Sequence, residues 1–396
     1  MKLNETHFIN GLRCSTWLKD PRAILTVRMW GFAAIPVLLV VFSTYLNQGL
    51  TNGIGKVIGE DFINYWMGAK FALSGHGIDV YDFKIFLDAL QNFAKATLEP
   101  YLYGYPPHFL LITLPVAFLP FGPALFVWTL LGWAAVYAMV KPMLGLHNAI
   151  LAVVASPAIF VNSLYGQNGA LSAVCLGGGL LLLKSHPLVA GILFGVLSYK
   201  PHLGLLIPLA LICAGHWRTF TSATVTVMTL VSVSIGLWGV DAWLAYMDRM
   251  AVVSQIFVHA DGLWHRMPTT FVTAQLLGVN QTLSWALQMP ALAAAIAAVV
   301  TVWRRPVSDS LKATTLVLAT FLATPYAWDY DLVVLTVMFA WRLQDNAWRP
   351  WEALALIMVI MLPFYSAMLI KTIGLPIGPA VIGWALWTTT RKPVQN

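Results

Sequence analysis

The sequence predicts an all-α protein that crosses a membrane many times, and three observations support this prediction. Residues of the types AVILMFWYC make up 59% of the 396-residue chain, and charged residues make up only 10%. Apolar runs close to bilayer length recur along the chain, beginning at residues 27–46. One water-soluble core cannot bury that much apolar surface, whereas helices of about 20 apolar residues each span a bilayer. We therefore expect about 10 to 13 transmembrane helices in a single integral membrane domain, residues 1–396.

The first apolar run, residues 27–46, is expected to be a retained helix that follows a cytoplasmic N-terminus. Basic residues precede it, and no small-residue cleavage pattern follows in "STYLNQG". Further along, basic residues lie singly or in pairs at the ends of apolar runs, as at Arg218 and at Arg304 and Arg305. The net charge of +7 therefore fits the positive-inside pattern and not a nucleic-acid surface.

The segment between the first two membrane runs, residues 47–106, is the one long stretch outside the apolar runs, and it is patterned. Apolar residues recur at helical spacing over 62–73 and, after the "SGHG" break, over 83–98. This pattern predicts two amphipathic juxtamembrane helices in the first extracytoplasmic loop, lying along the outer membrane surface. The alternative is that these helices only tether a loop. The proline-rich run "HFLLITLPVAFLPFGP" that follows is expected to be a partial or re-entrant segment.

Asp61 directly precedes the first of these helices, so its carboxylate should lie at the boundary between membrane and water. Asp61 has two interpretations. In the structural one, it is the N-cap of the helix. In the functional one, its carboxylate is a general base that takes the proton of an attacking sugar hydroxyl. Glu60 is the neighbouring substitute for this role.

Two further motifs place polar and aromatic groups where a sugar could bind. "GYPPHFLL" puts Tyr105 and His108 around two prolines, which either only make a rigid helix start or hold rings beside the surface helices. "GQNG" puts Gln167 and Asn168 between glycines, either as an ordinary interhelical turn or as two amides that bind sugar hydroxyls.

Lys200, in "LSYKPHLGLL", lies between two apolar runs, and His202 is the one other basic residue nearby. A charged lysine within the membrane or at its edge costs free energy, so its presence predicts a functional partner such as a lipid phosphate. A lysine that snorkels from a helix end is the alternative. Arg266, in "DGLWHRMPTTF", could also contact phosphate, or only water.

"TPYAWDYDLVVL" places Asp329 and Asp331 ahead of an apolar run in a chain with 16 acidic residues. The pair resembles the D-x-D of metal-dependent sugar transferases, a weak pattern that also suits a helix start. The aromatic side chains of Tyr326 and Trp328 fit carbohydrate binding or an interfacial belt. The three cysteines have no paired spacing, and no H-E-x-x-H, P-loop or G-x-S-x-G motif is present.

Taken in order, these motifs resemble glycosyltransferase family 87. The likeness covers roughly residues 55 to 340 and rests on an acidic residue opening "DFINYWMGAKFALSGHGIDVYD", then "YGYPPHFLLITLPVAFLP", "GQNG", "KPHLGLLIPLALI" and "TPYAWDYDL". The resemblance implies a GT-C fold and a polyprenyl phosphate sugar, typically of mannose, as donor. It implies that Asp61 is the catalytic aspartate. The family often carries histidines where "DYD" stands here.

The resemblance further implies a single inverting displacement in which Asp61 deprotonates the acceptor. Lys200, with Arg266 or His202, would stabilise the leaving phosphate. We expect no metal site, no obligatory cofactor and no nucleic-acid partner. The expected partners are the lipid-linked donor, a glycan or glycolipid acceptor and membrane lipids. The expected location is the bacterial inner membrane, with the site facing outward. The alternatives are a transporter or flippase of lipid-linked sugars and a non-catalytic subunit of an envelope glycan complex.

Overall fold

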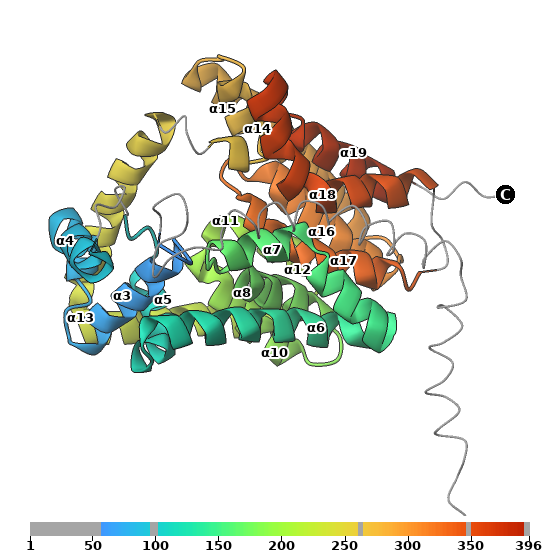
Figure 1. Ribbon diagram of the computed structural model, residues 1–396. Coiled ribbons are helices and arrows are strands. Elements are labelled where there is room, and N and C mark those ends of the chain that lie inside the picture. The colour runs from blue at the N-terminus through green and yellow to red at the C-terminus, as the bar shows by residue number, and fades with distance from the viewer. Residues whose placement is uncertain (1–56, 96–101, 260–263, 346–349, 392–396) are drawn as a thin grey trace, which may run out of the picture.

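The computed structural model describes residues 57–95, 102–259, 264–345 and 350–391, and every regular element in these ranges is helical. The predicted first membrane helix at 27–46 and the N-terminus lie outside the described residues. In Figure 1, α3 and α4 lie at the left end of the molecule and α18 and α19 at the right, with α7 and α8 between them.

Among the residues that the structure describes, four helices are long and apolar enough to cross a membrane, which confirms the all-α polytopic character. They are α6 (Phe121–Val154), α13 (Trp217–His259), α15 (Gln281–Trp303) and α18 (Pro350–Ile373). Only 11% of the apolar part of α13 and 17% of that of α6 is buried against the rest of the protein. Apolar side chains that face outward over such lengths are suited to lipid and not to water.

Shorter helices fill the rest of the described chain, and prolines begin or interrupt many of them. Four stretches are apolar but shorter than a full span, at Pro107–Phe118, Gly169–Leu182, Pro187–Tyr199 and Pro201–Ala214. The first corresponds to the proline-rich run expected to be a partial segment, and at about 1.5 Å per residue it does not reach across a bilayer core. The expected total of about 10 to 13 crossings stays a prediction.

The remaining helices have the following bounds. They are α5 (Pro107–Thr113), α7 (Pro157–Leu164), α8 (Gly169–Ala173), α9 (Gly179–Leu182), α10 (Pro187–Val196), α11 (Pro201–Gly204), α12 (Ile207–Ala214), α14 (Thr270–Leu276), α16 (Asp309–Ala323), α17 (Val333–Arg342) and α19 (Gly378–Thr390). Helices α16 and α17 form the centre of the core, because nearly all of their side chains are buried. The short 3-10 helix η8 (Asp329–Leu332) leads into α17.

Both helices predicted in the first loop are present, as α3 (Phe62–Leu73) and α4 (Phe83–Ala94). Helix α4 is amphipathic, with Phe86 and Leu90 buried and Phe83 exposed. Helix α3 differs from the expectation, because it is buried on nearly every side instead of lying on a surface. It packs against α4, α5 and α6, and it is packed closely at Gly68, where an added Cβ would lie 2.7 Å from the Tyr103 ring.

Candidate functional site

The loop between α7 and α8, Tyr165 to Asn168, lies at the centre of the candidate site. The two glycines that bracket the amides let this loop approach two other segments closely. Gly166 has φ +60°, and an added Cβ there would lie 2.5 Å from the Cβ of Phe62 at the start of α3. A Cβ on Gly169 would lie 2.1 Å from the carbonyl oxygen of Tyr330 in η8. The loop therefore joins the start of α3 to the "DYD" segment.

Asp61 is held by this loop and does not cap α3. Its side chain makes no capping hydrogen bond and instead accepts a hydrogen bond from Nε2 of Gln167. The Asp61 backbone N–H donates to the carbonyl oxygen of Tyr165 at 3.0 Å. The carboxylate is half-buried, so its position is fixed while part of it stays accessible.

Gln167 also connects Asp61 to a pair of tyrosines. The Tyr65 hydroxyl donates to Oε1 of Gln167 at 2.5 Å, and it lies 3.0 Å from the Tyr105 hydroxyl. Burial raises the pKa of Tyr105 above its ordinary value, so its phenol stays protonated. The result is a continuous chain of hydrogen-bonding groups that ends on the Asp61 carboxylate.

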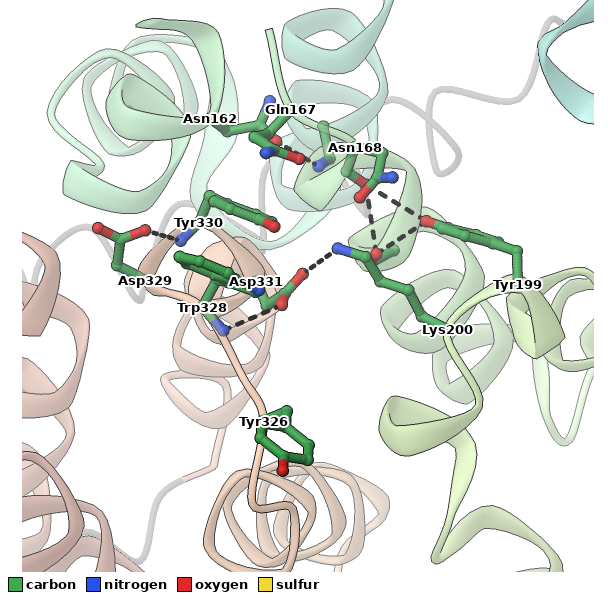
Figure 2. Close-up of polar contacts among 12 residues, drawn as sticks. Asn162, Gln167, Asn168, Tyr199, Lys200, Tyr326, Trp328, Asp329, Tyr330 and Asp331 are labelled. Carbon is green, nitrogen blue, oxygen red and sulfur yellow. Dashed lines mark hydrogen bonds and ion pairs between the residues drawn. The ribbon is translucent and has the colours of Figure 1, made fainter. Parts of the chain in front are cut away.

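Lys200 lies at the break between two short apolar helices, and its side chain points into the protein. Its Nζ donates to Oδ1 of Asp331 at 2.6 Å, with side-chain exposures of 4% and 0%. The second oxygen of Asp331 accepts from the Trp328 backbone N–H at 3.2 Å. The ammonium also lies 4.7 Å from the centre of the Tyr330 ring. Figure 2 shows Lys200 and Asp331 meeting from opposite sides of the site.

Arg266 and Asp329 form the second buried ion pair. The guanidinium donates two parallel hydrogen bonds to Asp329, from Nε at 3.1 Å and from Nη2 at 3.0 Å. Its Cζ lies 3.8 Å from the centre of the Tyr165 ring. Burial alone would lower the pKa of Arg266, but Asp329 raises it above its ordinary value, so the guanidinium stays charged.

These two pairs determine what the D-x-D motif does in this fold. Asp329 and Asp331 each hold a different cation, Arg266 and Lys200, and both cations lie close to the Tyr330 ring, at 5.8 Å and 4.7 Å from its centre. Within the described ranges, no group of three or more His, Cys, Asp or Glu side chains is arranged to hold a metal ion.

Asn168 lies beside these groups and is completely buried. Its backbone oxygen accepts from the hydroxyls of Ser172 at 3.2 Å and Tyr199 at 3.3 Å. Among the described residues its side-chain amide makes no hydrogen bond of standard geometry, although Tyr105 lies close enough to interact. Figure 2 shows Asn168 next to Tyr199 and above Lys200. A buried amide with unused hydrogen-bonding capacity is suited to a polar ligand.

The other predicted site residues occupy different surroundings. His108 contacts Ser198 Oγ at 3.0 Å and stacks on Trp243 with ring centres 5.7 Å apart, so it packs α5 against α13. Tyr326 packs against Phe271 in a small separate cluster. Glu60 is buried in the turn before α3.

Two predicted residues lie beside the ion pairs. His202 interacts electrostatically with both Lys200 and Asp331, and its buried Nε2 makes no hydrogen bond among the described residues. The ring of Trp328 stacks on Tyr330 with centres 5.9 Å apart.

Sequence reasoning missed four tyrosines that build the site. They are Tyr65, Tyr165, Tyr199 and Tyr330. Three of them directly adjoin a residue or motif that the sequence singled out: "GQNG", Lys200 and the two aspartates. Their position beside rare polar residues was the available signal.

A small, shallow recess opens to solvent beside the second ion pair. His265, Arg266 and Asp329 line one side, and apolar residues of α18, including Leu362 and Pro363, line the other. The recess therefore places a cation next to an apolar wall.

The fold and the site define an integral membrane protein that holds an accessible carboxylate and two buried, charge-paired cations around one loop. The model of glycosyltransferase family 87 matches residues 103–325, more than half of the chain, and the chain belongs to that family. It is therefore a membrane glycosyltransferase. The comparisons with curated proteins and with solved structures gave no match. The matched region contains "GQNG", Lys200 and Arg266, whereas Asp61 precedes it and Asp329 and Asp331 follow it.

Proposed function

We propose that the enzyme transfers a hexosyl group, mannosyl by family resemblance, from a polyprenyl phosphate sugar to a glycan or glycolipid acceptor. The reaction would take place at the outer face of a bacterial inner membrane. One observation carries the proposal: the "GQNG" loop holds the Asp61 carboxylate and also abuts the segment that holds Lys200 and Arg266. A base and two cations around one loop are the groups that transfer from a phosphate requires.

In this mechanism Asp61 is the general base. The acceptor hydroxyl oxygen attacks the anomeric carbon, and Asp61 takes the hydroxyl proton as the new glycosidic bond forms. The bond between that carbon and the phosphate oxygen breaks, and polyprenyl phosphate leaves from the opposite face with its electron pair. The anomeric configuration inverts. The hydrogen bond from Gln167 supports this role because it fixes the direction of the carboxylate.

Arg266 and Lys200 would stabilise the charge on the leaving phosphate. Each is held in place by an aspartate, so neither needs to be ordered when the donor binds. Nη1 of Arg266 makes no hydrogen bond within the described part of the chain and is available to a phosphate oxygen. The recess beside Arg266 runs along apolar side chains of α18, which would receive the first part of the lipid chain.

We also propose that the reaction needs no metal ion. The carboxylates of Asp329 and Asp331 each form an ion pair with a cationic side chain. Cationic side chains can stabilise the charge of a monophosphate leaving group without a metal ion. Sugar transfer by purified enzyme should therefore persist in EDTA. Loss of transfer that added Mg²⁺ or Mn²⁺ restores would contradict this part of the proposal.

The test is Asp61→Asn in membranes given a radiolabelled polyprenyl phosphate sugar. We expect transfer of label to fall at least about 100-fold, the usual contribution of a general base, with donor binding kept. Asp88→Asn is the matched control, because Asp88 is an exposed carboxylate on α4. Transfer by Asp61→Asn within about tenfold of the unsubstituted enzyme would remove Asp61 as the base. Movement of the labelled lipid across vesicles without transfer would favour a transporter.

A further inference from the structure

A second pocket lies at the other end of α16 from the candidate active site. Helix α16 has 15 residues and is therefore about 22 Å long. Its C-terminal end leads through Thr324 to the "DYD" segment, whereas Asp309 and Lys312 in its first turn line the second pocket. The pocket encloses about 40 Å³, opens to solvent, and is separate from the groups that the proposed reaction uses.

Positive charge predominates in this pocket. Lys184, Lys312 and His216 line it together with one carboxylate, that of Asp309. Lys184 pairs with Asp309 at 2.8 Å. Within the described part of the chain, the side chains of Lys312 and His216 have no hydrogen bond or ion pair. One ammonium is therefore left without a counter-charge in a recess, with an imidazole beside it.

The pocket walls place these charges at the end of apolar helices. Trp303, at the end of α15, is 2% exposed, and its Nε1 donates to the Lys312 carbonyl at 3.0 Å, which fixes the start of α16. Trp341 and the end of α9 complete the wall. Arg218 and Arg304 lie within two residues of pocket residues along the chain. Tryptophan and clustered basic residues at helix ends are characteristic of the lipid headgroup level.

We infer that this pocket binds a phosphate group, carried either by an anionic lipid headgroup or by free phosphate. Lys312 and Lys184 contact the phosphate oxygens, and His216 is within the same recess to donate a further hydrogen bond. The apolar ends of α9 and α15 receive the lipid chains where the phosphate belongs to a lipid. Asp309 limits the affinity because it competes for Lys184.

The test uses the full chain in nanodiscs that mix phosphatidylcholine with phosphatidylglycerol, with retained lipid counted by native mass spectrometry. Lys312→Gln should lower preferential retention of phosphatidylglycerol about fivefold, and adding Lys184→Gln should lower it about 25-fold in total. Asp309→Asn should raise retention, because it removes the competing charge. The matched control is Lys371→Gln, an exposed lysine on α18 that does not line the pocket.

A second arm adds inorganic phosphate to nanodiscs of phosphatidylcholine alone and measures its binding by ³¹P NMR. Lysine-dependent retention of phosphatidylglycerol supports the pocket with a lipid as the source. Lysine-dependent binding of inorganic phosphate without lipid preference supports it with free phosphate as the source. Retention and binding that are unchanged in the double lysine variant overturn the inference. A loss in Asp309→Asn as large as that in the lysine variants also overturns it, because opposite signs are required.

Discussion

Asp331→Asn removes the negative charge that holds Lys200 inside the protein, and we expect it to destabilise the fold strongly. The substitution keeps the shape of the side chain and an oxygen that can still accept the Trp328 N–H. What changes is that an ammonium with 4% exposure loses its counter-charge. Breaking a buried pair in this way costs about 3–5 kcal/mol.

The structure also limits the size of this loss. A buried lysine without a partner can release its proton, and each unit of pKa corresponds to about 1.4 kcal/mol. An unfolded lysine titrates near 10.4, so releasing the proton at pH 7 costs about 4.6 kcal/mol. The expected loss in free energy of unfolding at pH 7 is therefore about 3–4.6 kcal/mol. It should shrink as the pH rises toward 9, because the lysine proton that is released on folding costs less to remove as the pH approaches the pKa of the unfolded chain.

The assay is unfolding of purified protein in detergent, followed by tryptophan fluorescence at pH 7 and pH 9. The matched variant is Lys200→Met with Asp331→Asn, which removes both charges. Replacing a whole buried pair by uncharged groups is often neutral, so the double variant should recover most of the lost stability while transfer activity stays low.

Two results would refute this reasoning. A loss below about 1 kcal/mol for Asp331→Asn would mean that Lys200 finds water or another anion, in conflict with its burial. A double variant as unstable as the single one would mean that packing, and not the unpaired charge, causes the loss.

Three further predictions concern the loop and the second ion pair. Gln167→Leu removes the amide that orients the proposed base, so kcat should fall about 10- to 100-fold with donor KM little changed in steady-state transfer assays; an unchanged kcat would contradict this. Gly169→Ala places a methyl 2.1 Å from the Tyr330 carbonyl oxygen and should lower unfolding stability by about 1–3 kcal/mol in detergent. Gly204→Ala, where nothing lies within 4 Å, should not destabilise, and equal effects would refute the clash. Arg266→Lys keeps the charge but loses the paired hydrogen bonds, so donor KM should rise at least about fivefold; an unchanged KM would argue against phosphate contact.

Much of the fold follows from the sequence because bilayer helices are encoded locally. The long apolar runs correspond to α6, α13, α15 and α18, and the spacing of Phe86 and Leu90 predicts the buried face of α4. The burial of α3 could not be predicted in the same way. It depends on packing against α4, α5 and α6, as where Tyr103 meets Gly68, and such contacts are made by the tertiary fold and not by periodicity.

The charged and amide side chains of the candidate site could be predicted from the sequence, but its four tyrosines and the pairings between residues could not. Charged residues are rare in this chain, so the sequence identifies Lys200 and Asp331 as candidates one by one. However, 131 positions separate them, and no local pattern predicts that they pair. His108 is a residue whose role the local sequence does not predict. Its place beside two prolines predicts a site residue, whereas the fold directs it to Ser198 and Trp243.

The close fit of the "GQNG" loop between α3 and η8 has a consequence for biogenesis. Its partners, Asp61 and Tyr330, lie far apart in the sequence, so the centre cannot form until the chain has been synthesised through the "DYD" segment. A nascent chain that stops before residue 331 carries Lys200 without its counter-charge. Such an intermediate holds a costly unpaired charge in an apolar setting, and the site for sugar transfer is completed only when the "DYD" segment joins it.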